Sequence, residues 1–540
     1  MIDNYGKVDR NHFSFRKGII VPIKEETMTD RPPQFQNLGD WKPVELEEQG
    51  RILLRLIREH FEEIRDIPVS TTISAQELIG MLDHPLPEEP LPFADTLDET
   101  WEKIVPHLTH WNHPSFHAYF STSASAPGIL ADLLISSLNV NAMVWKSAPA
   151  ASALEKIVLR WLAEMVGYNP TAEGVLLNGA SLATFYALAA ARDVQEDLDV
   201  RTKGLTGRSL PRLRIYTSDQ AHSSVDKAAI ALGIGTDNVV RISTDQQYRL
   251  DPLKLAESIR ADLNQGYRPL AVVATVGTTA TGAIDPVEAI AQICEEFGIW
   301  LHIDAAYGGF WNLVPEVKGK TENLQWGDSL VVNPHKTLYT PLEVTALFCR
   351  RQGALANTFR LVPEYLQTVR EDGSVDFMDY SLQLGRSFRA LKLWWIIRSF
   401  GRKGLTARLE ESVRQARWLA QRVASHPDFV CVTASPFALL CLRYMPKVLK
   451  EAHQQSTAEQ KEKLDQYVDH LNKELMAKLN ESGRVFVSHA VIREGYVIRI
   501  SIGNIHTKME DIHRLWEQIQ KVGEELWAKK AATWKEEIKL

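Results

Sequence analysis

Residues 300–310 read WLHIDAAYGGF and residues 329–336 read SLVVNPHK, and these two motifs decide how the chain is interpreted. Each motif begins with a short apolar run that is typical of a buried strand, and each run stops at a charged or polar side chain. In an open α/β sheet, functional groups collect at the carboxyl ends of the strands. The pattern therefore predicts that Asp304 and Lys336 lie close together at neighbouring strand ends.

A lysine and an aspartate placed in this way suit an aldehyde cofactor. Lys336 follows Asn-Pro-His at the expected lip of a cleft, where its amine can form a Schiff base. A buried Asp304 can pair with a pyridinium nitrogen, and pyridoxal 5'-phosphate (PLP) requires both groups of its protein. Taken singly, the two residues have a simpler interpretation as a surface lysine and a helix-capping aspartate. Their occurrence together favours the cofactor.

The composition limits the class of protein. With 540 residues, the chain is long enough for more than one domain and a large core. Its formal net charge is −7 and no basic stripe stands out, so we expect no nucleic-acid partner. Four cysteines are too few for a disulfide framework and lack the spacing of metal ligands, which favours a reducing cytoplasm and no metal site. They are Cys294, Cys349, Cys431 and Cys441.

The first ten residues argue against a secretion signal, because Asp3, Lys7 and Asp9 precede any apolar run. No run of about 18 apolar residues occurs, so we expect no membrane partner. Residues 45–64 repeat apolar side chains at helical spacing, and a second helical stretch follows a proline-rich connector at 84–93. These two helices are expected to pack on the main domain or on a partner chain.

From about residue 127, helical patterns alternate with short strands rich in valine and isoleucine, which favours a mostly parallel sheet flanked by helices. We predict an N-terminal arm and helical dimerisation segment over 1–125. A large PLP-binding α/β domain is predicted over 126–390, and a small α+β domain over 391–540. The polar stretch 351–379 is long enough to be a functional loop, often a lid.

The segment GVLLNGAS, residues 174–181, reads as a strand, a turn of small residues and the start of a helix. Free backbone N–H groups and the helix dipole make such a turn a cradle for an anion. An ordinary tight turn with a serine cap explains the same residues, so this motif alone leaves both interpretations open.

Taken together, the motifs resemble those of the group II PLP-dependent decarboxylases, and most closely the aromatic-L-amino-acid decarboxylases. HPSFHAYF, HSSVDKA, GTTATGAID, HIDAAYGG, NPHK, FRLVPEYL and SFRALKLW occur in the order of that family. The resemblance extends from about residue 45 to the end of the chain. It implies a PLP enzyme of fold type I, acting as a homodimer whose active site lies at the subunit interface.

The resemblance also implies a role for individual residues. Lys336 would hold PLP covalently, Asp304 would keep the pyridine nitrogen protonated, and His222 would stack on the ring opposite Ala306. Thr279 would contact the cofactor near its ring oxygen. The residues expected at the phosphate are Ala180, Ser181 and Asn333, with His335 beside them.

On the substrate side, the resemblance places Thr122 against the substrate, with Tyr119, Phe120 and Trp145 in the pocket wall. After carbon dioxide leaves, the substrate carbanion needs a proton, and Tyr365 on the long loop is the expected acid. Related decarboxylases carry tyrosine there, whereas plant aldehyde synthases of the same group carry phenylalanine.

The chain also departs from the family pattern. Gly179 replaces a serine that is common in animal enzymes, so one hydroxyl contact to the phosphate is missing. Asn141 and Met143 occupy positions where animal relatives have isoleucine and phenylalanine lining the pocket of the neighbouring subunit. The resulting wall is more polar and more pliable, which leaves the exact substrate open. Gly385 leans toward tryptophan, by analogy with plant relatives in which glycine at this position accompanies indolic substrates.

We expect decarboxylation of tryptophan, tyrosine or dopa to the amine. The alternatives are another substrate of group II, an aldehyde synthase, or a non-catalytic scaffold. The scaffold is disfavoured because it could have lost Lys336 or Asp304.

Overall fold

The computed structural model describes residues 39–120, 122–361 and 373–538. By its internal contacts the chain forms two units, one ending at Glu63 and one beginning at Ile64. In the first unit, α1 (Pro43–Glu63) has apolar residues at helical spacing and charged residues between them, as the sequence predicts. None of the α1 residues is buried. No helix in the described ranges is long and apolar enough to cross a membrane.

The second unit begins with two short helices. One of them, α3 (Phe93–Glu99), is the helix expected after the proline-rich connector. The other, α2 (Ala75–Leu82), was not expected from apolar spacing, although its start carries a signal. Ser74 and Glu77 form a reciprocal capping box, the Ser-x-x-Glu pattern that satisfies the free N–H groups of a helix start.

A seven-stranded sheet forms the centre of the second unit, in the order β1-β7-β6-β5-β4-β2-β3. All its neighbouring strands are parallel except around β7, which runs antiparallel to both β1 and β6. This confirms the α/β class with a mostly parallel sheet; the reversal of β7 was not predicted. The strands are β1 (Glu173–Leu177), β2 (Leu213–Ser218), β3 (Val239–Ile242), β4 (Arg268–Thr275), β5 (Trp300–Asp304), β6 (Ser329–Val332) and β7 (Thr345–Cys349).

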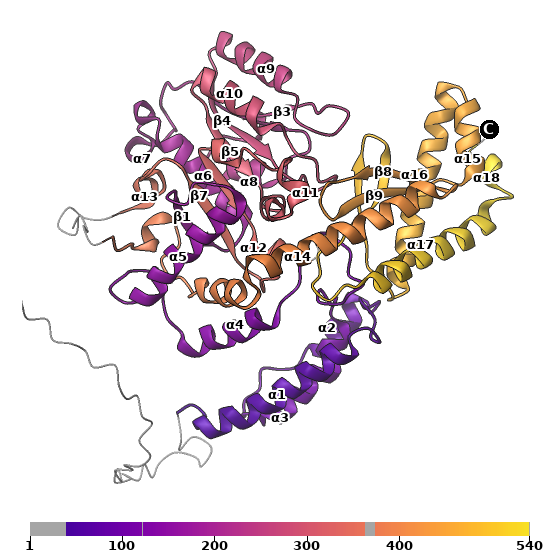
Figure 1. The fold of residues 1–540 in the computed structure, drawn as a ribbon, viewed down its shortest axis with the longest axis horizontal. Coiled ribbons are helices and arrows are strands. Elements are labelled where there is room, and N and C mark those ends of the chain that lie inside the picture. Colours follow the sequence, from indigo (N-terminus) through magenta and orange to yellow (C-terminus); the bar gives the residue numbers. More distant parts are fainter. Residues whose placement is uncertain (1–38, 121, 362–372, 539–540) are drawn as a thin grey trace, which may run out of the picture. The chain divides into compact units, whose positions relative to one another are not determined.

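Helices surround this sheet in Figure 1, and α6 crosses it in contact with β1, β4, β5, β6 and β7. Eight residues of α6 are buried, and six of them form the continuous run Tyr186–Ala191. The helices of this part are α4 (Ala126–Leu138), α5 (Pro149–Val166), α6 (Ala180–Asp193), α7 (Val200–Lys203), α8 (Ser224–Ala231), α9 (Pro252–Asn264), α10 (Val287–Phe297), α11 (Pro315–Lys318), α12 (Pro334–Thr337) and α13 (Ala354–Phe359).

The long helix α14 (Ala390–Ser425) contacts α4 and α5 near the large sheet and also the C-terminal elements (Figure 1). It bends at Gly401, whose φ of 62° is one that glycine adopts without a steric penalty. A four-stranded antiparallel sheet follows, in the order β10-β11-β9-β8, which matches the expected α+β region. The proposed boundaries at 125 and 390 remain predictions. These elements are β8 (Phe429–Ala434), β9 (Leu439–Tyr444), α15 (Lys447–Gln455), α16 (Ala458–Glu481), β10 (Ser488–Ile492), β11 (Gly495–Ser501), α17 (Met509–Lys530) and α18 (Trp534–Glu537).

One buried ion pair ties α5 to the end of β1. Arg386 and Glu155 are 1% and 2% exposed, and an Nη2–Oε1 distance of 2.6 Å joins them. Arg386 also donates to the carbonyl of Leu176, and Glu155 accepts from the N–H of the same residue. Removal of either partner would leave an unpaired buried charge, which makes this pair a determinant of local stability.

We expect Arg386→Met to lower the free energy of unfolding by about 3–5 kcal/mol, since the Glu155 carboxylate would lose its buried partner. Urea unfolding followed by circular dichroism measures the change. The double variant with Glu155→Leu should regain a large part of the loss.

The exposed pair Arg417–Glu316 provides a matched control, with side chains that are 56% and 64% exposed at 2.6 Å. Arg417→Met should change stability by less than about 1 kcal/mol. Equal losses for Arg386→Met and Arg417→Met would contradict the importance given to burial.

Candidate active site

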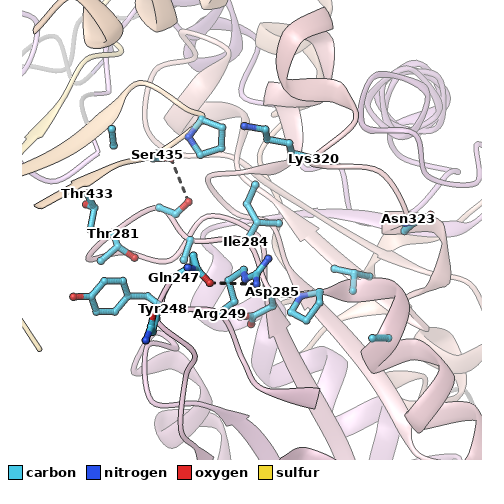
Figure 2. A pocket seen from close by; sticks show the side chains of 18 of the residues that line it. Gln247, Tyr248, Arg249, Thr281, Ile284, Asp285, Lys320, Asn323, Thr433 and Ser435 are labelled. Carbon is cyan, nitrogen blue, oxygen red and sulfur yellow. Dashed lines mark hydrogen bonds between the residues drawn. The ribbon is translucent and has the colours of Figure 1, made fainter. Parts of the chain in front are cut away.

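Two cavities of the second unit are candidates for the functional site. The larger, of about 960 Å³, lies between the loop after β4 and residues 432–436 of the small sheet (Figure 2). Its wall includes Asp285, which accepts hydrogen bonds from the N–H groups of Leu250 and Thr275. Burial raises the pKa of Asp285 to about 7. Its lysine, Lys320, is exposed and follows the short helix α11 rather than a strand of the large sheet, so it does not match the lysine predicted for the cofactor.

The smaller cavity, of about 240 Å³, contains both Asp304 and Lys336. It opens where β1, β5 and β6 end, because these strands run parallel and finish at one edge of the sheet. The residues that line it are Phe120, Asn178, Gly179, Ala180, Ser181, His222, Thr275, Gly277, Thr279, Asp304, Ala306, Tyr307, Asn333, His335, Lys336, Leu342 and Glu343.

Lys336 lies in the one-turn helix α12 directly after β6. Its Nζ is 4.4 Å from the centroid of the Phe120 ring. Burial lowers the pKa of Lys336 to about 8, with a further contribution from Arg499 that opposes the effect of Asp304. A larger fraction of the amine is therefore unprotonated near neutral pH, and that is the form that attacks an aldehyde.

Asp304 is the last residue of β5, 7% exposed, and accepts a hydrogen bond from the N–H of Ala306 at 3.1 Å. Beside it, the hydroxyl of Thr275 is buried and has no hydrogen-bond partner among the described residues. A carboxylate at this depth requires a cation to offset the cost of burial. The protonated nitrogen of a pyridine ring meets that requirement.

His222 follows β2 and lies at the same edge of the sheet. Its Nδ1 accepts from the N–H of Ser224 at 3.1 Å, so the proton of the neutral ring is on Nε2. Burial lowers the pKa of His222, Asp304 raises it, and the charges of Lys336 and Lys227 lower it further. The wall therefore presents a neutral aromatic ring, as stacking on a planar cofactor requires.

The part of the cavity wall at the start of α6, called the anion end below, is suited to an anion. Gly179, Ala180 and Ser181 form the start of α6, where free N–H groups and the helix dipole attract negative charge. Asn333 accepts from the Thr345 hydroxyl at 2.8 Å through its carbonyl oxygen, which leaves its NH2 group as a donor. The cradle predicted from the sequence is thus present at this end.

His335 is 8% exposed, and its ring Nδ1 donates to the carbonyl of Val344 at 2.7 Å. Burial lowers the pKa of His335 to about 4, and Lys336 contributes to the decrease. The ring is therefore neutral and fixed in orientation beside the anion end.

Most of the residues selected from the sequence line this one cavity. The structure brings together Phe120, Ala180, Ser181, His222, Thr279, Asp304, Ala306, Asn333, His335 and Lys336. This agreement concerns position only, and the roles assigned to the residues stay predictions.

Three predicted substrate residues do not line the cavity of this chain. Tyr119 has a φ of 51° and is 55% exposed, and its ring stacks on that of Trp111 at 5.6 Å. Thr122 is buried outside the cavity wall. Trp145 is also outside it, and its backbone N–H donates a hydrogen bond to the Asp376 carboxylate at 2.7 Å. The predicted acid Tyr365 lies outside the described residues.

Sequence reasoning missed Arg499, which reaches the site from β11 of the small sheet. Arg499 is 2% exposed, donates to the carbonyl of Thr279 at 2.6 Å and also donates to the carbonyl of Tyr119. Its guanidinium carbon is 4.7 Å from the centroid of the Phe120 ring. A signal was present, since an arginine inside the apolar run YVIRISI is unusual in a buried strand.

Tyr307 and Asn178 were also missed, although each adjoins a recognised motif. The ring of Tyr307 stacks on that of Phe120 with centroids 4.1 Å apart. The Phe120 ring also lies close to two cationic side chains, Lys336 and Arg499. Aromatic rings at this spacing make a rigid, apolar wall.

The residues present fit PLP. The cavity combines a lysine of lowered pKa, a buried carboxylate, a neutral histidine ring and a helix start in one place. The lysine could form a Schiff base with the aldehyde of PLP, and the carboxylate could pair with its protonated ring nitrogen. The N–H groups at the helix start could bind its phosphate.

Comparison with known proteins agrees with this geometry. Residues 76–445 match the family model described as the pyridoxal-dependent decarboxylase conserved domain. A phenylacetaldehyde synthase from a Rosa hybrid cultivar is 33% identical over 88% of this chain and 94% of its own length. Tyrosine decarboxylase 2 of Arabidopsis thaliana is 33% identical over 89% of this chain and 88% of its own.

A solved structure gives the same result for the fold. The crystal structure of Oryza sativa TDC with PLP and tryptamine superimposes with a TM-score of 0.84. It is 31% identical and covers 91% of this chain and 100% of the other. The family resemblance and the PLP cofactor expected from the motifs are therefore confirmed. We conclude that the chain belongs to the pyridoxal-dependent decarboxylase family, as a PLP-dependent amino-acid decarboxylase of group II.

Proposed function

We propose that the protein decarboxylates an aromatic L-amino acid, of the tryptophan, tyrosine or dopa type, to the corresponding amine and carbon dioxide. The observation that carries this proposal is the aromatic wall beside Lys336. The Phe120 ring lies 4.4 Å from Nζ and stacks on Tyr307, so an aromatic side chain finds an apolar surface next to the reacting amine. The names of the relatives, which include tyrosine decarboxylase 2, support the same substrate class.

The residues of the site suit the loss of a carboxylate. When PLP is bound, it supplies an electron sink for the bonds at the substrate's Cα. Lys336 would hold the cofactor, Asp304 would keep its ring nitrogen protonated, and the neutral His222 ring would cover one face opposite Ala306. Thr279, fixed through its carbonyl by Arg499, would border the ring.

Charge at the cavity wall favours release of carbon dioxide. Among the described residues that line the cavity, Lys336 is the one cationic side chain, because His222 and His335 both have lowered pKa values. Arg499 is not among these lining residues, so a substrate carboxylate meets no guanidinium in the described cavity wall itself. Weak binding of the carboxylate in the ground state leaves more of the binding energy for the transition state.

A second candidate function is oxidative conversion of the same substrates to aldehydes. It is favoured by the similarity to a phenylacetaldehyde synthase. The loop position of Tyr365 separates the two candidates, because a hydroxyl there can protonate Cα whereas an aromatic hydrocarbon cannot. The presence of tyrosine leads us to propose the amine as the product.

We also propose that the active protein is a homodimer with the active site at the interface. Several leucine side chains are exposed on the described chain, and exposed apolar surface of this kind is typical of a protein–protein interface. Leu342 lines the active-site cavity and is nevertheless 63% exposed. The others are Leu130, Leu133 and Leu138 on α4, and Leu382 and Leu384 before α14. A cytoplasmic location remains our proposal as well, supported by four cysteines that are all unpaired.

We expect purified protein with PLP to release amine and carbon dioxide from at least one of tryptophan, tyrosine, dopa and phenylalanine. Lys336→Ala should lower the turnover by about 10³-fold or more, because the amine that carries the cofactor is gone. Chromatographic amine assay with a carbon dioxide assay measures both. Glutamate and 2,4-diaminobutyrate serve as controls; a preference for either would contradict the aromatic assignment.

We expect Tyr365→Phe to change the product from amine to mainly aldehyde, because the substrate carbanion loses its proton donor. Oxygen and water would be consumed, and ammonia and hydrogen peroxide would be formed with the aldehyde. Product chromatography and an oxygen electrode provide the measurement. If Tyr365 only packs the loop, the variant will turn over more slowly but will still form amine alone, and the proposed role is then wrong.

We expect Leu133→Glu combined with Leu384→Glu to shift the protein from dimer to monomer, since two charges would enter an apolar interface. Light scattering coupled to size-exclusion chromatography measures the mass. Leu253→Glu on α9, where the native leucine is 77% exposed, is the matched control and should remain dimeric. A dimeric double variant would place the interface elsewhere.

A further inference from the structure

The anion end of the cofactor site lacks charged partners. PLP carries a phosphate that is a dianion near neutral pH, yet no arginine lines the described cavity. The amine of Lys336 would be used for the Schiff base with the aldehyde of PLP, so it would not pair with the phosphate. Glu343 lines the same cavity and adds a carboxylate. The start of α6 contributes only about half of a positive charge. The phosphate therefore needs further donors from the surrounding residues.

Asn178, the residue between β1 and the α6 turn, has one end of its side chain fixed. Arg389 donates a hydrogen bond from Nη2 to the Oδ1 of Asn178. A guanidinium has only donors, so the contacting atom must be the amide oxygen. The NH2 group of Asn178 is then the free end, and it has no hydrogen-bond partner within the described parts of the chain. Asn178 also lines the cavity, so a donor is available at the anion end.

Arg389 itself is an unusual residue for this position. It is 6% exposed, and its Nη1 is buried with no hydrogen-bond partner among the described residues. Burial and the neighbouring Arg386 lower the pKa of Arg389, while Glu155 and Glu343 raise it. Glu155 and Glu343 supply negative charge near this guanidinium, but the buried donor Nη1 stays unused, and a bound phosphate would add an anion on the side of Asn178.

We propose that Asn178 is an additional phosphate-binding residue of the PLP site, and that Arg389 is the positioning residue that presents its NH2 group. The amide supplies a donor next to Gly179, where serine-containing relatives have a hydroxyl. The buried charge of Arg389 strengthens that donor, because a hydrogen bond to an ionised group is stronger when its donor is polarised by a cation.

The phosphate itself allows a sharp test, because pyridoxal is PLP without that group. Apo-protein prepared from the holoenzyme is titrated with PLP and separately with pyridoxal, and binding is followed by visible absorbance and tryptophan fluorescence. We expect Asn178→Ala to weaken PLP binding about tenfold, the loss of one hydrogen bond to a charged group. Pyridoxal binding should change less than about twofold.

Three further variants separate binding from structure. Asn178→Asp keeps the shape and the contact with Arg389 but puts a carboxylate beside the phosphate, so it should weaken PLP binding more than alanine does. Asn333→Ala removes an amide predicted at the same phosphate and is the positive control. Leu182→Ala, in the first turn of α6 with a side chain that is 43% exposed, is the negative control.

The positioning role of Arg389 is tested by combining Arg389→Met with Asn178→Ala. Arg389→Met should show the same selective loss of PLP affinity, and the double variant should lose no more than Asn178→Ala alone. If Arg389→Met does not fold, the two Asn178 variants still decide the question. Equal losses for PLP and pyridoxal, or an unchanged PLP affinity in Asn178→Ala, would overturn the proposal.

Discussion

The parallel pairing of β5 with β6 is the constraint on which the rest of the site depends. In this register Asp304 lies opposite Val331, so the ends of the two strands are level. Asp304 and Lys336, 32 positions apart in the chain, are thereby held at one edge of the sheet, close enough for Asp304 to act on the pKa of Lys336. Everything else at the site, from the α6 turn to the His222 ring, is arranged around this fixed pair.

The small C-terminal sheet supports the cavity wall through Arg499, although no described residue of that sheet lines the cavity itself. Arg499 crosses from β11 and donates to the carbonyls of Thr279 and Tyr119, which belong to distant segments. It also contributes to the lowered pKa of Lys336. The two sheets are thus coupled electrostatically at the reacting amine as well as by packing.

The central part of the site could be predicted from the sequence because strand ends in a parallel sheet follow a simple rule. Asp304, Lys336 and the Ala180–Ser181 turn were found in this way, and they line the cavity. This rule does not predict Arg499, whose position depends on how two sheets pack. It also does not predict that Tyr119, which has a positive φ, is exposed outside the cavity wall. The direction of β7 could not be settled from the sequence, because the 12 residues between Val332 and Thr345 are about the minimum for a helical crossover.

The antiparallel direction of β7 has a consequence for how the enzyme can diversify. Because β7 starts at the edge where β6 ends, the chain after Lys336 turns back within the site and never leaves for the far side of the sheet. Leu342 and Glu343 on that return belong to the cavity wall. The lysine proposed to carry the cofactor and part of the cavity wall are therefore encoded in one short, contiguous segment, residues 336–343. Substitutions at Leu342 and Glu343 can change the cavity wall without changing Asp304, which lies on a different strand.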